Sequence, residues 1–158
     1  MKKTIVKLVK KTGIWLDFKN AYVFTITGHD EPVMEKIESG IESRVRYAGE
    51  KSQVTRFNNS VFGEKEKKQH RMQHEKARYF DNVLSRLIDT DYVYVFGPGE
   101  AKEGLRAAMK KNHLVHGQLA ACEICGKLTL NQMRQRVLQF FSDEKFMLVK
   151  ELFETQKN

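Results

Sequence analysis

Short runs of alternating hydrophobic and polar residues fill the first third of the chain, with the period expected of β-strands. Residues 13–28, GIWLDFKNAYVFTITG, predict a β-hairpin with its tight turn at Lys19-Asn20. Residues 41–49, IESRVRYAG, predict a further strand that places its arginines on one face. Residues 30–40 between them, DEPVMEKIESG, predict a short helix with a proline in its first turn.

The middle of the chain changes to a helical period. Residues 49–63 show no period and predict a long loop, whereas residues 64–89 predict a long helix. The first half of this helix, EKEKKQHRMQHEKAR, is almost wholly polar, so we expect it to project past the core as a charged arm. The second half carries hydrophobic residues at i, i+3 and i+4 spacing, which predicts burial. They are Tyr79, Phe80, Val83, Leu84, Leu87 and Ile88.

Strands and helices alternate in the rest of the chain. The predicted elements are a strand at 92–96, a helix at 100–111, a strand at 116–126, a helix at 129–141 that starts with a capping box of Thr129 and Gln132, and an amphipathic segment at 146–153. This order predicts an α/β fold with a mixed sheet flanked by helices. The 158 residues predict a single domain, 1–158, with its core at about 12–142 and a C-terminal helix at about 143–156.

The charge is concentrated in one region. The whole chain carries +8, and between Arg44 and Arg78 ten Lys and Arg stand against four Glu. Such a patch is typical of proteins that bind polyanions, although a solvated basic face is the plainer interpretation. We expect no membrane association, because no segment approaches the roughly 20 apolar residues of a membrane helix. Two cysteines and an N-terminal apolar run interrupted by lysines favour the cytoplasm.

Two features that could carry chemistry are a glycine-proline-glycine turn and a pair of cysteines. Gly97-Pro98-Gly99 stands between a strand and a helix but lacks the Gly-Lys-Ser/Thr of a phosphate loop, so we interpret it as a structural corner. Cys122 and Cys125 would point to opposite faces of a strand, which favours core residues over a metal or redox site. We therefore expect no metal and no cofactor.

A ribonuclease-H-like nuclease is an alternative that rests on acidic residues. Such enzymes need several carboxylates around paired divalent ions. Asp17 is the candidate ligand, and its candidate companions are Glu42, Asp89 and Asp91. An aspartate at this place is more often a hydrogen-bonded hairpin residue.

The segments IWLDFKNAYVFTITG, ESRVRYAG, SQVTRF, HEKARYFDNVL and VYVFGPGEAKEGL follow one another in an order that resembles a known domain. It is similar to the central domain of archaeal and eukaryotic class-I peptide-chain release factors and of the ribosome-rescue factor Pelota. The resemblance covers residues 12–142 and implies a corner, not an active site, at the Gly-Pro-Gly. It also implies binding to the ribosome through rRNA or tRNA, with another translation factor as a further partner.

The loop departs from the release factors at their catalytic tripeptide. Release factors carry Gly-Gly-Gln, whose Gln helps water attack the ester of peptidyl-tRNA, and Pelota lacks it and does not hydrolyse peptidyl-tRNA. Here residues 49–53 read Gly-Glu-Lys-Ser-Gln. We therefore expect a non-catalytic, RNA-binding factor in ribosome rescue, hibernation or stress. The expected RNA contacts are Arg44, Arg46, Lys51, Arg56, Phe57, Lys65, Lys67, Lys68 and Arg71.

Two alternatives remain beside this expectation. The first is a peptidyl-tRNA hydrolase with Gln53 as its candidate catalytic residue. It is an enzyme, as is the nuclease considered above. The other is a protein-interaction module without RNA binding. Phe57, a ring within a polar loop, would stack on a base in the RNA-binding case and hold the loop in place in the other.

Overall fold

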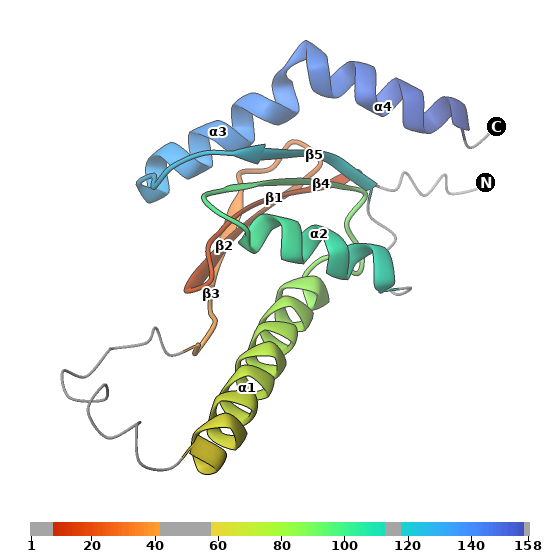
Figure 1. Ribbon diagram of the computed structural model, residues 1–158. Coiled ribbons are helices and arrows are strands. Elements are labelled where there is room, and N and C mark those ends of the chain that lie inside the picture. The colour runs from red at the N-terminus through yellow and green to blue at the C-terminus, as the bar shows by residue number, and fades with distance from the viewer. Residues whose placement is uncertain (1–7, 42–57, 113–117, 157–158) are drawn as a thin grey trace, which may run out of the picture.

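The computed structural model describes residues 8–41, 58–112 and 118–156 (Figure 1). The elements are β1 (Lys10–Leu16), β2 (Asn20–Thr27), β3 (Val33–Glu38), α1 (Asn58–Ser85), β4 (Tyr92–Gly97), α2 (Ala101–Lys111), β5 (Gln118–Ile124), α3 (Leu130–Ser142) and α4 (Glu144–Gln156). The strands form one sheet in the order β3-β2-β1-β4-β5. The fold is therefore α/β with a mixed sheet, as the sequence predicts.

Strand β1 lies at the centre of the sheet. It pairs antiparallel with β2, from Lys10 opposite Thr27 to Leu16 opposite Ala21, and parallel with β4. The β2–β3 pair is antiparallel and the β4–β5 pair is parallel. The hairpin half and the crossover half of the sheet thus meet at β1, and helix α2 makes the crossover between the parallel strands β4 and β5.

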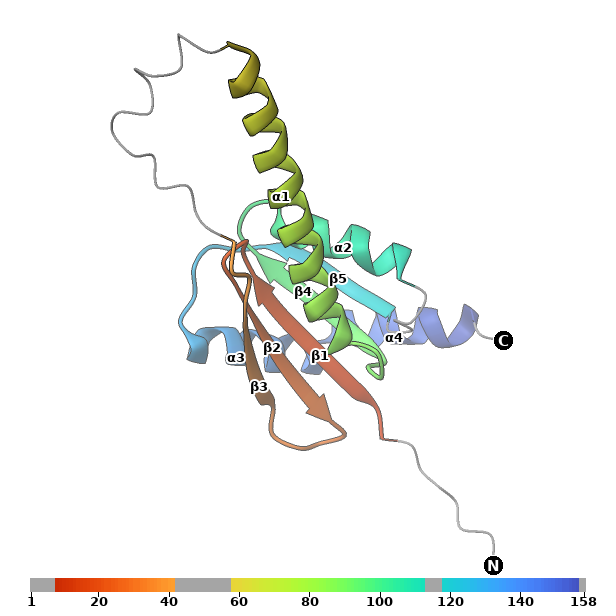
Figure 2. The ribbon, with the colours of Figure 1, turned by 90° about the horizontal axis from the view of Figure 1, so that it is seen from below.

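Helices cover both faces of the sheet. α1 and α2 lie on one face, and α3 with α4 lies on the other (Figures 1 and 2). Every residue of β4 is buried, and its side chains alternate between the two layers. Val93 and Val95 pack with α1 and α2, whereas Tyr94 and Phe96 pack with α3. The sheet therefore has two separate hydrophobic cores, one on each face.

The turn of the first hairpin differs from the prediction. Strand β1 ends at Leu16, so Asp17 lies in the turn rather than within the strand. Its carboxylate accepts hydrogen bonds from the backbone N–H groups of Lys19 and Asn20, at 2.8 and 2.7 Å. A short acidic side chain that binds the backbone two and three residues ahead stabilises a tight turn. Asp17 thus has the plainer of the two roles considered for it.

Residues 33–38 form a strand, and the short helix predicted there is wrong. β3 is an edge strand whose only buried side chain is Ile37; the others, including Val33 and Met34, are exposed. An edge strand with so little burial shows no alternation of hydrophobic residues, and the spacing of Val33, Met34 and Ile37 imitates a helical period. Pairing with β2 fixes the extended backbone instead.

Helix α1 is longer at its start and shorter at its end than the sequence predicts. It begins at Asn58, inside the predicted loop, and ends at Ser85 instead of residue 89. Ile88, predicted to be buried, lies beyond the helix and is 48% exposed. The predicted strand at 41–49 and most of the predicted loop fall within 42–57, outside the described residues.

The corner after β4 has a steric explanation. A Cβ atom on Gly97 would lie 2.2 Å from the carbonyl oxygen of Leu16, so only glycine fits where β4 passes the end of β1. Gly99 has φ of 64°, a left-handed conformation that glycine adopts at little cost. Glu100 is the N-cap residue of α2 and makes no side-chain capping bond, and its negative charge would repel an anion at the start of that helix. The Gly-Pro-Gly turn is a structural corner.

Candidate nucleic-acid interface

The second half of α1 is fixed to the sheet. Tyr79, Val83, Leu84 and Leu87 are at most 2% exposed, and they pack in the core that α1 and α2 share with the sheet. The Tyr79 hydroxyl donates a hydrogen bond to the carbonyl oxygen of Asp17 at 2.8 Å. Burial raises the pKa of that hydroxyl, so it remains a donor at physiological pH. These contacts set the direction of the whole helix.

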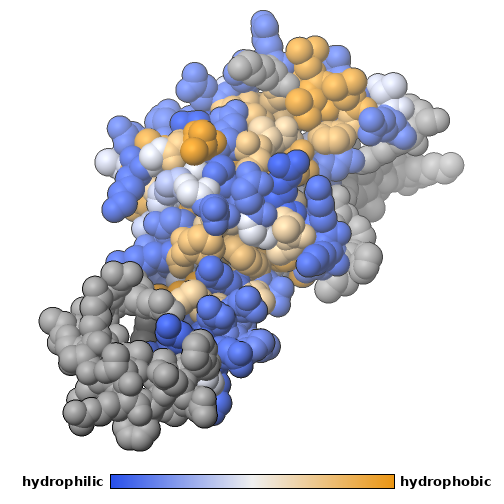
Figure 3. All heavy atoms as spheres, in the orientation of Figure 1, coloured by the Kyte–Doolittle hydropathy of each residue, from blue (hydrophilic) through white to orange (hydrophobic). Residues whose placement is uncertain are grey.

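The first half of α1 projects away from the sheet as an arm (Figures 1 and 2). Between Glu64 and Arg78, Met72, Glu75 and Lys76 are half-buried and every other side chain is exposed. Lys76 lies where the arm meets the core, with its ammonium 4.5 Å from the centre of the Phe18 ring. The predicted charged arm is therefore present in the structure. Hydrophilic residues dominate its surface in Figure 3.

A stripe of cations and one histidine runs along the arm. Its members stand at the spacing i, i+4, i+7 and i+11, and they are Lys67, Arg71, His74 and Arg78. Viewed along the helix axis, they fall within an arc of about 60°. All four side chains are exposed. By the same helical geometry this basic stripe lies on the side of α1 opposite to its buried residues, and it spans about 16 Å. It is the surface of the arm that is farthest from the protein core.

The arm's glutamates do not neutralise this basic stripe. Glu64, Glu66 and Glu75 lie to its sides, and Glu64 is three residues before Lys67 while Glu75 is four residues after Arg71. Within the described ranges, no ion pair joins a carboxylate to Lys67, Arg71 or Arg78. The charges are thus available to an external anion, and their exposure keeps the cost of desolvation low.

The structure separates the helix cations that the sequence grouped together. Lys67 and Arg71 share the basic stripe, whereas Lys65 lies on the opposite side of the helix and Lys68 lies on its flank. His74 and Arg78 belong to the basic region of the sequence but were not among the expected RNA contacts, and the helical spacing adds them to the stripe. The other expected RNA contacts, namely Arg44, Arg46, Lys51, Arg56 and Phe57, and the candidate Gln53 lie outside the described residues.

The carboxylates of the nuclease alternative do not converge. Asp17 follows the last residue of β1, whereas Asp91 accepts a hydrogen bond from the backbone N–H of Lys10, the first residue of that strand. The seven residues between these positions span about 20 Å. Asp89 forms an ion pair with Lys10 at the same far end. Glu42 is outside the described residues, and among the described residues no three metal-ligating side chains gather.

The cysteines point to opposite faces of the sheet, as predicted. Cys122 packs against the core under α1 and α2, and Cys125 packs against the core under α3 and α4. Both are half-buried rather than fully buried, which corrects the expectation of core cysteines. Burial raises the pKa of both thiols, so the thiolate is scarce near neutral pH. His113 and His116, the histidines nearest to these cysteines in the sequence, lie outside the described residues.

The comparisons with known proteins found similarity in structure but not in sequence. No family model matches the chain, and no curated protein of similar sequence was found. The crystal structure of the archaeal translation termination factor aRF1 aligns with 94% of this chain at 12% sequence identity and a TM-score of 0.48. The chain spans 39% of the length of that protein. In the part of the chain that the structure describes, no helix has the length and hydrophobicity to cross a membrane.

Proposed function

We propose that the protein binds RNA through the basic stripe of α1 and acts in the cytoplasm as a non-catalytic, ribosome-associated factor in rescue, hibernation or stress. The observation that carries the RNA-binding part is the stripe itself: three cations and a histidine on one exposed side of a projecting helix. The ribosomal part depends on the resemblance of the sequence segments to the central domain of release factors and Pelota.

The spacing of the basic stripe suits a polyphosphate. Successive members are three or four residues apart and follow one another along about 16 Å of the helix. A nucleic-acid backbone presents phosphates at regular intervals over such a distance, and each contact releases a condensed counterion. Protein carboxylates rarely form so long and regular a row, which favours a nucleic acid over an acidic protein surface as the partner.

The arm's position also supports recognition of a large partner. α1 is held at its second half, so the basic stripe is presented beyond the sheet and its helices (Figure 2). A rigid helix presents its charges without first losing much conformational entropy. A phosphate backbone can therefore approach the stripe without contacting the protein core.

The sequence of the loop favours binding over hydrolysis. Close approach of a backbone to an ester requires glycine, and Glu50 stands where the release factors have one of their two glycines. A glutamate at that place also adds a negative charge next to a negative substrate. We therefore propose that Gln53 has no catalytic role and that Gln53→Ala leaves function unchanged.

The test of RNA binding is the dependence of affinity on salt. Lys67, Arg71 and Arg78 are replaced together by Gln, and the slope of log affinity against log salt is measured on single-stranded RNA. If each cation contacts one phosphate, the slope becomes shallower by about 2. The matched control replaces the exposed cations of α2, Arg106, Lys110 and Lys111, by Gln, which removes the same net charge from another helix.

The proposal predicts a change of slope in the α1 variant and little change in the α2 variant. Equal changes in both variants would show that net charge, not the basic stripe, attracts RNA. An unchanged slope in the α1 variant would remove this helix from the contact. Sedimentation with ribosomes at low and high salt then tests the ribosomal part separately, and the enzyme alternative is tested by peptide release from peptidyl-tRNA. Stimulation of release that disappears in Gln53→Ala would favour the hydrolase.

A further inference from the structure

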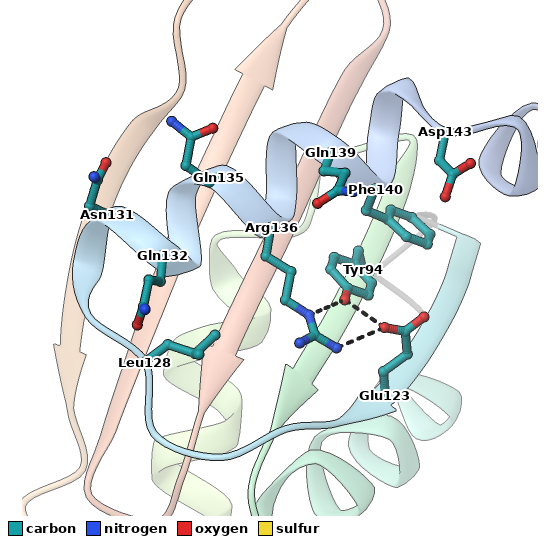
Figure 4. A pocket seen from close by; sticks show the side chains of 10 residues that line it. All are labelled: Tyr94, Glu123, Leu128, Asn131, Gln132, Gln135, Arg136, Gln139, Phe140 and Asp143. Atoms are coloured by element: carbon teal, nitrogen blue, oxygen red, sulfur yellow. Dashed lines mark hydrogen bonds and ion pairs between the residues drawn. The ribbon is translucent and has the colours of Figure 1, made fainter.

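A groove lies between α3 and β5, on the face of the sheet opposite to α1 (Figure 4). Its volume is about 510 Å³, within the usual range of small-molecule sites. At its centre are Tyr94 of β4, Glu123 of β5 and Arg136 of α3, which come from three different elements. Neither the basic stripe nor the loop of the resemblance includes any of these residues.

A network of hydrogen bonds holds one edge of the Arg136 guanidinium. Its Nε donates to the Tyr94 hydroxyl at 2.9 Å, and its Nη2 donates to Oε2 of Glu123 at 3.1 Å. The Tyr94 hydroxyl donates to the same carboxylate oxygen at 2.8 Å. Tyr94 is 1% exposed and stacks on Phe140 with 3.9 Å between ring centres, so the anchor of the arginine is rigid.

The other edge of the guanidinium is available to a ligand. A guanidinium carries five N–H donors on two usable edges, and the network occupies only the edge that contains Nε. In the described part of the chain, Nη1 of Arg136 donates to no protein acceptor. Figure 4 shows this free edge facing Leu128 and Gln132, away from Glu123. The side chain is 35% exposed, which permits a ligand to reach it.

Gln132 adds a donor on the same side of the groove. Its Oε1 accepts a hydrogen bond from the backbone N–H of Thr129 at 3.0 Å, as part of the capping box that starts α3. That bond fixes the amide so that Nε2 presents its hydrogens as donors. The half-buried Leu128 supplies an apolar surface between Gln132 and Arg136. This part of the groove therefore offers donors around a hydrophobic floor.

The ligand that fits is a neutral one with paired acceptors. Glu123 already compensates the charge of Arg136, so a phosphate or carboxylate at the free edge would gain little from that charge. A neutral ring with two neighbouring acceptor atoms does not depend on the charge and still uses both donors of the free edge. Among the bases of nucleic acids, guanine presents such a pair in O6 and N7, and arginine is its commonest partner.

We propose that this groove binds a guanine base, with the free edge of Arg136 donating to O6 and N7 and with Leu128 against the ring. Tyr94 and Glu123 are positioning residues that hold the guanidinium. The inference deepens the proposed function by adding a guanine site. It rests on the proposed RNA binding only where RNA is taken as the source of the base, because RNA and free guanine nucleotides present the same base. The groove and the basic stripe lie on opposite faces of the sheet, so their tests are separable.

The experiment titrates isotope-labelled protein with GMP, AMP and 7-deaza-GMP, which lacks the N7 acceptor. The reporter is the NMR signal of the Trp15 indole N–H, which donates to the carbonyl oxygen of Gly126 beside the groove at 3.2 Å. GMP is expected to bind roughly 10-fold more tightly than AMP or 7-deaza-GMP, since a bidentate contact contributes about 1–3 kcal/mol. Equal affinities for the three nucleotides, or full competition by inorganic phosphate, would overturn the proposal.

Two variants locate the contact. Arg136→Lys keeps the positive charge but removes the paired N–H donors of the free edge, so the preference for GMP should disappear. Arg134→Lys is the matched control on the same helix; that arginine pairs with Glu31 and should keep the preference. A preference that survives in Arg136→Lys contradicts the proposed contact. Tyr94→Phe removes one hydrogen bond that holds the guanidinium, so it should weaken the binding of GMP and leave the binding of AMP unchanged.

Single-stranded RNA oligomers with and without one guanine distinguish the two sources. Tighter binding of the guanine oligomer than of GMP assigns the site to RNA, and equal binding assigns it to the free nucleotide; both support a guanine site. The variant with Lys67, Arg71 and Arg78 replaced separates this inference from the proposed function. An unchanged salt slope in this variant together with a retained guanine preference rejects only the basic stripe. A shallower slope in this variant, together with equal affinities of the unsubstituted protein for GMP and AMP, rejects only the groove.

Discussion

The two halves of α1 belong to one continuous helix but have opposite surroundings. From Tyr79 onward one side of the helix is buried between α2 and the sheet, whereas before Arg78 almost all side chains are exposed. In the second half, the side of the helix toward the sheet carries hydrophobic side chains. In the first half, the cations Lys67 and Arg71 lie on the opposite side of the helix.

This contrast separates stability from recognition within one element. Burial of hydrophobic area stabilises the fold, while exposed charges contribute little to stability and much to association with a polyanion. Substitutions in the anchored half should therefore change the free energy of unfolding, and substitutions in the arm should change RNA affinity alone. Four predictions test this separation, in order of expected effect.

The largest effect is expected for Phe80→Ala in the anchored half. Phe80 is 9% exposed, stacks on Tyr79 and contacts Phe18, so its removal leaves a cavity. We expect the free energy of unfolding to fall by about 3–5 kcal/mol, as measured by urea denaturation. The matched control is Gln73→Ala in the exposed arm, for which the expected change is within about 0.5 kcal/mol. A comparable loss in both variants would show that the arm is part of the core.

The second prediction compares proline at two exposed positions of α1. Asn82→Pro lies in the anchored half, where a broken helix also displaces buried side chains, and we expect it to cost about 3 kcal/mol or more of global stability. Gln69→Pro breaks the same backbone in the arm and should lower helical ellipticity while leaving the urea midpoint almost unchanged. If Gln69→Pro also shifts the midpoint, the two halves unfold together and the separation fails.

The third prediction makes the same substitution, glycine to alanine, at two positions where we expect opposite changes in stability. A Cβ on Gly104 of α2 would lie 2.6 Å from Cζ of Phe80, so Gly104→Ala should destabilise by about 1 kcal/mol despite its better helix propensity. Gly63 at the far end of α1 has open space around it, and Gly63→Ala should stabilise the arm by about 0.5–1 kcal/mol. Ellipticity and hydrogen exchange along α1 measure both changes.

The sequence predicts the anchored parts of the fold better than the exposed parts, for a physical reason. Strong periodicity marks β1, β2, β4 and the buried end of α1, because burial on a defined face requires it. β3 lacks that constraint, since only Ile37 is buried there, and its helix-like spacing misled the prediction. The start of α1 likewise carries no hydrophobic period in the sequence, and the predicted start at residue 64 was six residues late.

The candidate sites divide in the same way. The cations of the basic stripe are visible in the sequence because they are close together in it, and only the helical geometry was needed to separate Lys65 from Lys67. The groove could not be found from the sequence. Tyr94 and Arg136 are 42 residues apart, and only the packing of α3 on the sheet brings them together. Gly13 permits that packing, since a Cβ there would lie 2.4 Å from Val137.

The smallest effect is expected for the ion pair that joins Arg86, directly after the end of α1, to the edge strand β3. Nε of Arg86 lies 2.9 and 2.8 Å from the two carboxylate oxygens of Glu35, but both side chains are more than a third exposed. Water and salt screen such a pair, and the entropy of two long side chains opposes it, so the coupling energy should be about 0.2–1 kcal/mol. A double-mutant cycle of Arg86→Ala and Glu35→Ala in urea denaturation measures that energy, and it should shrink in 1 M salt. The pair Lys36–Glu38 within β3, 3.3 Å apart, is the control because it does not reach α1. A coupling well above this range that persists in high salt would mean that the anchored half of α1 depends on charge as well as on burial, and the contrast between its two halves would then be one of degree.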